Sequence, residues 1–260
     1  MNQDVKVIHQ DAKIGEGVEI GPFTHIHGDV EIGEGTWIGS NVTIMDGARI
    51  GKNCRIFPGA VISAVPQDLK YKGEITYAVI GNNTTVRECA TINKGTAARG
   101  KTRIGNNCLL MAYSHIGHDC EIENNVIIGN STQIAGEVEI DDFAILSGQI
   151  GVHQFSKIGK HTMVQGMSGI GKDVPPFVIA GRNPLVYAGL NSVGLKRRGF
   201  SSETINSILD IYRILYQSGL NTTNAVKEIE DKIPESTEKT EILNFIKESK
   251  RGIIKGLLNS

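Results

Sequence analysis

The side chains best suited to chemistry in this sequence are two histidines and an acid that lie close together, His115, His118 and Asp119. An imidazole titrates near neutral pH, so a histidine can act as a general base toward an alcohol. Two histidines three residues apart on a helix could instead hold a metal ion. The choice between a base and a metal ligand therefore depends on the element that carries them.

A basic run near the C-terminal third is a second candidate for chemistry, Lys196, Arg197 and Arg198. Arginine binds a diphosphate well because its planar fork donates two hydrogen bonds at once. The same run could attract an acidic partner protein. Alternatively, the run is simply exposed to solvent and binds nothing. The sequence does not decide among phosphate binding, partner binding and a solvated surface.

A six-residue repeat of aliphatic side chains determines the element that carries the histidines. It runs from Ile8 to Ile62, continues at Ile80, Val86 and Ile92, and extends from Ile104 to Ile170, often with glycine as the next residue. A helix has a period of 3.6 residues and an ordinary strand a period of 2. A short strand followed by a sharp turn, repeated, has a period of six and predicts a parallel β-helix. His115 and His118 then lie on different phases of a coil, which disfavours a metal pair.

The residue two before each repeat position is mostly small, and three of the four cysteines occupy this phase, Cys54, Cys108 and Cys120. We therefore interpret them as packing residues rather than ligands or nucleophiles. The cysteines show no CxxC spacing. This usage favours a reduced, cytoplasmic protein.

Composition and charge exclude several classes of function. The chain has 27 basic and 28 acidic residues, a formal net charge of -1, which argues against a strongly basic nucleic-acid binder. No apolar run is long enough for a membrane span, so no stable membrane insertion is expected. The first residues show neither a basic nor an apolar region of a signal peptide.

The repeat has two interruptions and an end. Residues 66–71 and 95–100 lack the pattern although the frame survives them, which predicts loops that leave the coil. Helical spacing begins after Ser201, with further helices predicted over 224–232 and within 238–258. The sequence thus predicts a β-helix over residues 1–183, the catalytic part, and an α-helical domain over residues 184–260.

Several segments in order along the chain resemble the hexapeptide-repeat acyltransferases, and among these the UDP-N-acetylglucosamine acyltransferases. They are Pro66–Tyr71, Leu109–Met111 with His115–Cys120, Val152–Phe155, Asp173–Pro176 and Gly194–Phe200. The resemblance implies a mainly β fold, a left-handed parallel β-helix with a C-terminal α-helical domain, and a homotrimer. It also implies 18 residues per coil, which stacks His118, Gly136 and Gln154 in one outward column about 4.8 Å apart.

The activity implied is the first step of lipid A synthesis, transfer of an (R)-3-hydroxyacyl group from acyl carrier protein to the glucosamine 3-hydroxyl of UDP-N-acetylglucosamine (UDP-GlcNAc). An alcohol is a poor nucleophile at neutral pH, so His118 is expected as general base. The Gly136 amide would hold the oxyanion. Asp119 matches the adjacent acid of the family, but spacing cannot tell whether it orients the imidazole. No metal and no organic cofactor is implied, because a thioester is already activated.

The resemblance assigns substrate contacts to further positions. The nucleotide sugar is expected at the first loop and at the basic run, and the acyl chain at Gly166, where a larger side chain would shorten the groove. A structural hydrogen bond is the alternative for His153. The expected substrate-binding residues are Gln67, Asp68, Lys70, His115, His153, Gln154, Gly166, Asn191, Arg197 and Arg198.

Departures from the family pattern leave some choices open. Asn93 and Glu137 stand where some members have histidine, and Gln165 and Arg182 are bulky near the expected acyl groove. Acyl chain length and the choice between UDP-GlcNAc and its 3-amino analogue are therefore undecided. The rival functions are a related N-acyltransferase, a metal-dependent β-helix enzyme with three ligating histidines, and a non-catalytic trimeric scaffold.

Overall fold

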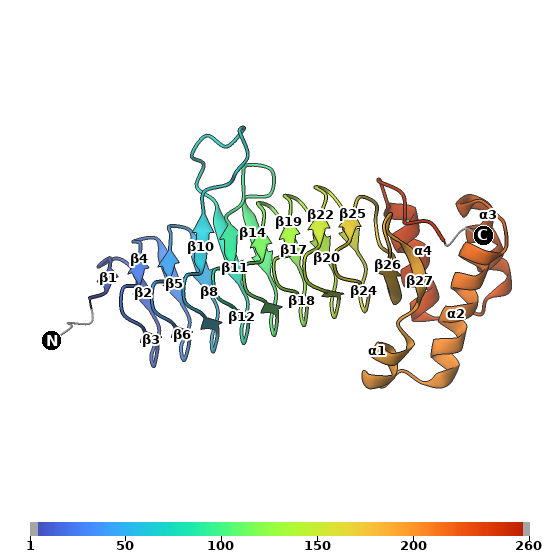
Figure 1. Ribbon diagram of the computed structural model, residues 1–260, viewed down its shortest axis with the longest axis horizontal. Coiled ribbons are helices and arrows are strands. Elements are labelled where there is room, and N and C mark those ends of the chain that lie inside the picture. Colours follow the sequence, from blue (N-terminus) through green and yellow to red (C-terminus); the bar gives the residue numbers. More distant parts are fainter. Residues whose placement is uncertain (1–4, 257–260) are drawn as a thin grey trace.

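The computed structural model describes residues 5–256, and most of the chain winds into a parallel β-helix of triangular cross-section. Its strands stack along the long axis, and four helices cover the C-terminal end (Figure 1). Three sheets, named A, B and C, form the sides of the prism. The predicted parallel β-helix with C-terminal helices is confirmed.

Each sheet takes every third strand, so that one coil contributes one strand to each side. Sheet A contains β1 (Val7–Ile8), β4 (His25–Ile26), β7 (Thr43–Ile44), β10 (Val61–Ala64), β13 (Thr91–Asn93), β16 (His115–Ile116), β19 (Gln133–Ile134), β22 (Gly151–Val152) and β25 (Gly169–Ile170). Sheet B contains β2 (Lys13–Ile14), β5 (Val30–Ile32), β8 (Ala48–Ile50), β11 (Tyr77–Ile80), β14 (Lys101–Ile104), β17 (Glu121–Ile122), β20 (Glu139–Ile140) and β23 (Lys157–Ile158). Sheet C contains β3 (Glu19–Ile20), β6 (Trp37–Ile38), β9 (Arg55–Ile56), β12 (Thr85–Val86), β15 (Leu109–Leu110), β18 (Ile127–Ile128), β21 (Ile145–Leu146), β24 (Met163–Val164), β26 (Val178–Gly181) and β27 (Val186–Leu190).

The repeat residues fill the interior of the prism. Ile116, Ile134 and their equivalents are fully buried, and paired residues of sheet A such as His115 and Gln133 are 18 apart. Cys54, Cys108 and Cys120 are buried with free thiols, as the packing interpretation predicted. Burial raises the pKa of Cys108 to about 11 and that of Cys120 to about 12, so these thiols stay protonated at neutral pH.

Most corners of the prism place one residue in the left-handed backbone region. Asparagine, which tolerates that region, fills many of them, for example Asn53, Asn107 and Asn125. On the edge where the chain passes from sheet A to sheet B (the AB edge), Asp119 takes this conformation with φ 59°. The corner geometry thereby turns the Asp119 carboxylate into the protein, where it is 0% exposed.

Two loops leave the coil at the AB edge, as the sequence predicted. The first (residues 65–76) joins β10 to β11, and the second (residues 94–100) joins β13 to β14. They stand out from one side of the prism beside β10, β11 and β14 (Figure 1). Both loops therefore lie on the edge that carries His118.

The C-terminal part differs in detail from the prediction. An unpredicted antiparallel pair, β26 with β27, extends sheet C, and a short helix follows, α1 (Ser192–Arg197). The remaining helices are α2 (Ser202–Gln217), α3 (Thr222–Lys232) and α4 (Thr237–Glu248). The region predicted as helix over 238–258 is helical only to Glu248, with 257–258 outside the described residues; Ile253 forms a β-bridge to Asp173 and Lys255 one to Val186 of β27. Within residues 5–256, no helix combines the length and apolarity that crossing a bilayer requires.

Candidate functional site

The site is built on the AB edge, where the turns after β16, β19 and β22 stack directly on one another. These turns carry His118, Gly136 and Gln154, and the strands before them pair in register. The column predicted from the 18-residue spacing is therefore present on one edge. The two loops stand beside it because they interrupt the same edge.

The His118 imidazole is held at its Nδ1 atom by Asp119. Its Nδ1 lies 2.8 Å from Asp119 Oδ2, so the Nδ1–H donates to the carboxylate and Nε2 is left free to accept a proton. The His118 side chain is 11% exposed. The structure thus places an oriented imidazole with an uncommitted Nε2 on the AB edge, which is the arrangement of a general base.

The second loop fixes Asp119 in turn. Its carboxylate accepts from the Thr96 N–H at 3.0 Å and 3.1 Å, from the Thr96 hydroxyl at 2.6 Å and from the Arg99 N–H at 3.1 Å. The Thr102 hydroxyl lies 2.8 Å from the Asp119 backbone nitrogen. These donors hold the buried Asp119 carboxylate in one orientation. In that orientation its Oδ2 faces the Nδ1 of His118. Sequence reasoning missed Thr96 and Arg99, although the frame-preserving insertion beside the column was a signal for them.

Gly136 lies directly against the imidazole. A Cβ at this position would overlap His118 Nε2 and come within 2.5 Å of Cε1, so only glycine fits under the ring. The Gly136 N–H donates to no other group in the part of the chain that the structure describes. A free backbone donor therefore lies beside the basic nitrogen.

The first loop faces the same nitrogen. Asp68 Oδ2 lies 3.9 Å from His118 Nε2, and the Asp68 carboxylate also accepts from the Lys70 N–H at 2.9 Å. Gln67 and Lys70 are exposed beside it. The start of this loop is fixed by the end of β13, because Asn93 Nδ2 donates to Val65 O at 2.6 Å.

Three further predicted residues lie near this edge. His115 projects outward from β16, and its Nδ1 shares a 2.8 Å hydrogen bond with the Thr91 hydroxyl. Burial and the nearby His118 lower the pKa of His115, which keeps it neutral. Gln154 is half-buried one coil beyond Gly136, and exposed His153 bonds to the Gln154 carbonyl at 2.8 Å.

The other predicted residues lie elsewhere on the prism. Gly166 lies in the turn between β24 and β25, at the edge from sheet C to sheet A. Arg198 follows α1 and donates to Phe143 O at 3.2 Å, at the edge from sheet B to sheet C, and Arg197 is exposed beside it. One chain therefore does not bring Gly166 or the arginines to His118.

Asn191 has a local structural role in this chain. Its side chain caps α1 by accepting from the Gly194 N–H, and it donates to His161 O at 2.8 Å. Burial lowers the pKa of Arg198, and Arg198 Nη1 is buried without a partner in the described structure. The Asn191 amide is thus occupied, whereas Arg198 retains an unused donor.

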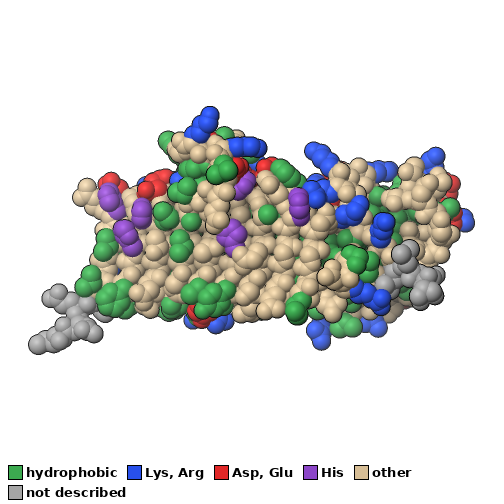
Figure 2. Space-filling view, turned by 45° about the horizontal axis from the view of Figure 1, so that its top comes forward, with side chains coloured by type: hydrophobic (Ala, Val, Ile, Leu, Met, Phe, Trp, Pro, Cys, Tyr) green, Lys and Arg blue, Asp and Glu red, His purple; other side chains and the backbone are tan. Residues whose placement is uncertain are grey.

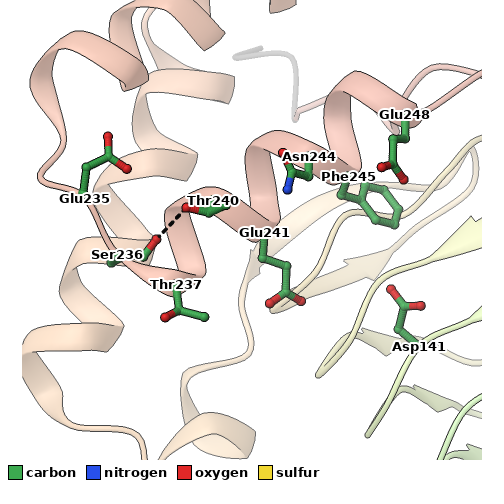
Figure 3. Close-up of a pocket in the computed structure, with 9 residues that line it drawn as sticks. All are labelled: Asp141, Glu235, Ser236, Thr237, Thr240, Glu241, Asn244, Phe245 and Glu248. Atoms are coloured by element: carbon green, nitrogen blue, oxygen red, sulfur yellow. Dashed lines mark hydrogen bonds between the residues drawn. The ribbon is translucent and has the colours of Figure 1, made fainter.

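A separate hollow of about 700 Å³ lies between the coil and α4, lined by Asp141 together with Glu241, Glu248 and other residues of the helical part (Figure 3). Burial, reinforced by the nearby Glu241, raises the pKa of Asp141 to about 6. The hollow adjoins the turn after β20, at the edge from sheet B to sheet C, and so is not part of the AB edge. Within residues 5–256, no three His, Cys, Asp or Glu side chains converge as a metal site would require.

Comparison with known sequences gives consistent matches over nearly the whole chain. The family described as UDP-N-acetylglucosamine O-acyltransferase, domain 2, matches residues 173–254, and bacterial transferase hexapeptide repeats match residues 11–36, 29–64 and 101–136. A Chlorobaculum tepidum protein named acyl-[acyl-carrier-protein]–UDP-N-acetylglucosamine O-acyltransferase is 60% identical over 240 residues, 92% of this chain and 91% of that protein. A Sulfurihydrogenibium protein of the same name is 59% identical over 248 residues, 95% and 92% of the two chains.

Solved structures agree with these sequence matches. The UDP-N-acetylglucosamine acyltransferase of Bacteroides fragilis superposes with a TM-score of 0.96 at 52% identity, covering 98% of this chain and 100% of that one. The Arabidopsis enzyme of the same name gives a TM-score of 0.85 at 31% identity, covering 96% and 98%.

Proposed function

This chain belongs to the UDP-N-acetylglucosamine O-acyltransferase family, and from that premise we propose how its AB edge performs the reaction. The reaction is transfer of an (R)-3-hydroxyacyl group from acyl carrier protein to the glucosamine 3-hydroxyl of UDP-GlcNAc, the first step of lipid A biosynthesis. One observation carries the proposal: an imidazole oriented by a buried carboxylate lies over a glycine with an unused N–H.

His118 acts as the general base. Its Nε2 takes the proton of the 3-hydroxyl as that oxygen attacks the thioester carbonyl, and the imidazolium is stabilised by Asp119. The tetrahedral intermediate then collapses, the carbon–sulfur bond breaks, and the imidazolium gives its proton to the leaving thiolate. A base of this kind is worth about 10²–10⁴ in rate.

Gly136 supplies the oxyanion donor. Its N–H lies beside the ring that removes the proton, so the thioester oxygen can meet this donor while its carbonyl carbon meets the sugar oxygen. We assign substrate-positioning roles to Gln154 and His153, which lie in the turn after β22, and to His115, which projects from β16 beside the edge.

The acceptor sugar binds at the first loop. Asp68 faces the Nε2 that removes the proton, so a sugar hydroxyl that meets the base also meets this carboxylate. Gln67 and Lys70 extend the contact from the same exposed loop.

The contrast between two faces of the prism, sheets B and C, favours a homotrimer. Sheet B carries outward charges paired along the ladder, for example Arg103 with Glu121 at 2.6 Å, as a solvated face does. Sheet C instead carries an outward stripe of half-exposed aliphatic residues, Leu109, Ile127, Ile145, Met163 and Ile179. An apolar stripe of this kind favours cover by another protein surface.

A neighbouring copy also completes the site. Sheet C lies opposite the AB edge, with Gly166 at one of its borders and Arg198 near the other. If sheet C of one copy faces the AB edge of the next, Gly166 can meet the acyl chain, and Arg197 and Arg198 can meet the nucleotide, with buried Asn191 holding the start of α1 beside them. Such head-to-tail contacts close into a ring. Substitution Ile127→Lys should then yield monomers in sedimentation and abolish transfer, whereas a monomeric parent would refute the shared site.

Two broader assignments accompany this proposal. We assign the catalytic edge to a β-helix domain that the sequence places in residues 1–183 and the helices to a C-terminal domain over 184–260, with β27 of that second part still paired to the β-helix. The reaction is placed in the cytoplasm, where acyl carrier protein supplies the donor.

The decisive assay offers UDP-GlcNAc and its 3-amino analogue as acceptors to the purified chain, with hydroxyacyl carrier proteins of several chain lengths. The proposal predicts a 3-O-acylated product from UDP-GlcNAc. Preference for the 3-amino analogue would move the acceptor assignment to that sugar, and absence of transfer to either would overturn the function.

A further inference from the structure

The catalytic column continues for one more coil, and the residue there is a lysine. β25 pairs in register with β22, and the turn after it places Lys172 18 residues beyond Gln154. Adjacent strands lie about 4.8 Å apart, so Lys172 stands roughly 14 Å from His118 along the axis of the prism. The positively charged Lys172 therefore lies at the C-terminal end of the AB edge, the edge that also carries the base His118 and the oxyanion donor Gly136.

The C-terminal segment brings more positive charge to this point. The Asp173 N–H donates to Gly252 O at 3.0 Å, and Ile254 N–H donates to Asp173 O at 2.9 Å. The Arg251 guanidinium donates to Gly171 O through Nε at 3.2 Å and Nη2 at 2.9 Å. These contacts hold the C-terminal segment against the last coil, and we define its basic residues together with Lys172 as the end cluster: Lys172, Lys250, Arg251 and Lys255.

The charge of the end cluster is not neutralised within residues 5–256. None of its four members forms an ion pair there, and Lys172, Lys250 and Lys255 are exposed. The neighbouring acid Asp173 is buried and its carboxylate accepts from the Lys157 N–H at 2.8 Å and the Ser249 hydroxyl at 2.6 Å. Basic side chains accordingly gather over the C-terminal half of this face, and histidines over the N-terminal half and the middle (Figure 2).

The end cluster also borders a hollow. The residues lining a space of about 590 Å³ between the last coil and the helices include both Lys172 and Lys255. Lysine and arginine are the side chains that bind phosphate oxygens. The chemistry of this end of the edge therefore suits a phosphate group.

We propose that the end cluster binds the phosphodiester of the carrier's phosphopantetheine arm and thereby sets the register of the thioester on Gly136. This inference rests on the proposed function. The arm has about as many bonds between its sulfur and its phosphorus as four residues of extended backbone, a reach of roughly 14 Å. That length matches the span from His118 to Lys172.

The diphosphate of the nucleotide sugar fits this position less well. It is attached to C1 of the same ring that carries the reacting 3-hydroxyl, so it must remain within a short distance of His118. A phosphate three coils away is therefore better supplied by the donor than by the acceptor.

The test compares donors that differ only in the phosphate, namely the hydroxyacyl thioesters of phosphopantetheine and of pantetheine. The parent enzyme should show a KM about tenfold lower for the phosphorylated donor, since a charge-assisted contact is worth that much. Lys172→Ala and Lys250→Ala should reduce this discrimination, leaving the KM for UDP-GlcNAc unchanged. The matched control is Lys227→Ala, which removes an exposed lysine on α3.

Two results would overturn the assignment. If Lys172→Ala raises the KM for UDP-GlcNAc and leaves donor discrimination intact, the cluster binds the nucleotide instead. If it behaves like Lys227→Ala, the cluster binds neither substrate. Because both readings need an active enzyme, they are distinct from a failure of the proposed function, in which the parent itself shows no transfer.

Discussion

Gly136→Ala is the substitution that tests the packing of the site most sharply. The added methyl group would overlap the imidazole of His118, with only 2.5 Å to Cε1. Carbon atoms in contact are normally about 3.5 Å apart, so the ring must move by about 1 Å. The backbone of Gly136 is not in the left-handed region, and alanine therefore adds a clash without backbone strain.

The expected cost follows from that displacement. A reacting group misplaced by 1 Å loses about 10²-fold in rate. The loss should appear in kcat, because the loops that bind the sugar are untouched. The midpoint of thermal unfolding should change little, since the ring can move toward solvent at the prism surface.

The measurement is steady-state transfer from the hydroxyacyl carrier to UDP-GlcNAc, with Gly171→Ala as the control. Gly171 lies on the same edge, and a Cβ there meets nothing within 4 Å. The control should retain parental kcat. A Gly136→Ala enzyme with kcat within threefold of the parent would refute the close contact between ring and glycine.

Three further substitutions test the surroundings of the site and the stability of the fold. Asp119→Asn should lower kcat about 10²–10⁴-fold in the same assay, because an amide cannot accept from all the donors that hold the carboxylate; unchanged kcat would contradict the orienting role. Burial raises the pKa of Asp141 to about 6 from 3.8, so its contribution to stability is present below pH 4 and lost as pH rises through 6. Asp141→Asn should therefore raise the free energy of unfolding by up to ~3 kcal/mol at pH 7 but not at pH 4, by chemical denaturation. Burial between aromatic rings lowers the pKa of His161 to about 4 from 6.5, so the parent should lose on the order of 3 kcal/mol as pH falls through this window. His161→Phe should remove that dependence, and parallel pH profiles for variant and parent would contradict it.

The coil was predictable because its signal is periodic. Each repeat residue, such as Ile116, must point inward once per strand, so one frame determines strands, turns and core together. With the 18-residue coil that the family resemblance implies, the same frame predicts that His118, Gly136 and Gln154 share an edge. The helix beginning after Ser201 was also predictable, because Ser201 caps it by accepting from the Thr204 N–H.

The support of the site could not be read from the periodicity. Thr96 and Arg99 lie in an insertion, where the repeat no longer specifies direction, and only the folded loop shows that their N–H groups meet Asp119. Likewise, the pairing of Asp173 with Gly252 joins segments far apart in the chain. Long-range contacts between irregular segments leave no pattern in the sequence.

The central claim is that the His118 imidazole is the base for acyl transfer, and one comparison tests it most directly. The parent chain and His118→Ala are assayed for 3-O-acylation of UDP-GlcNAc by the hydroxyacyl carrier, with the mass of each measured by sedimentation. We predict loss of at least about 10²-fold in kcat with unchanged mass and unfolding midpoint. Near-parental activity in His118→Ala would contradict the account.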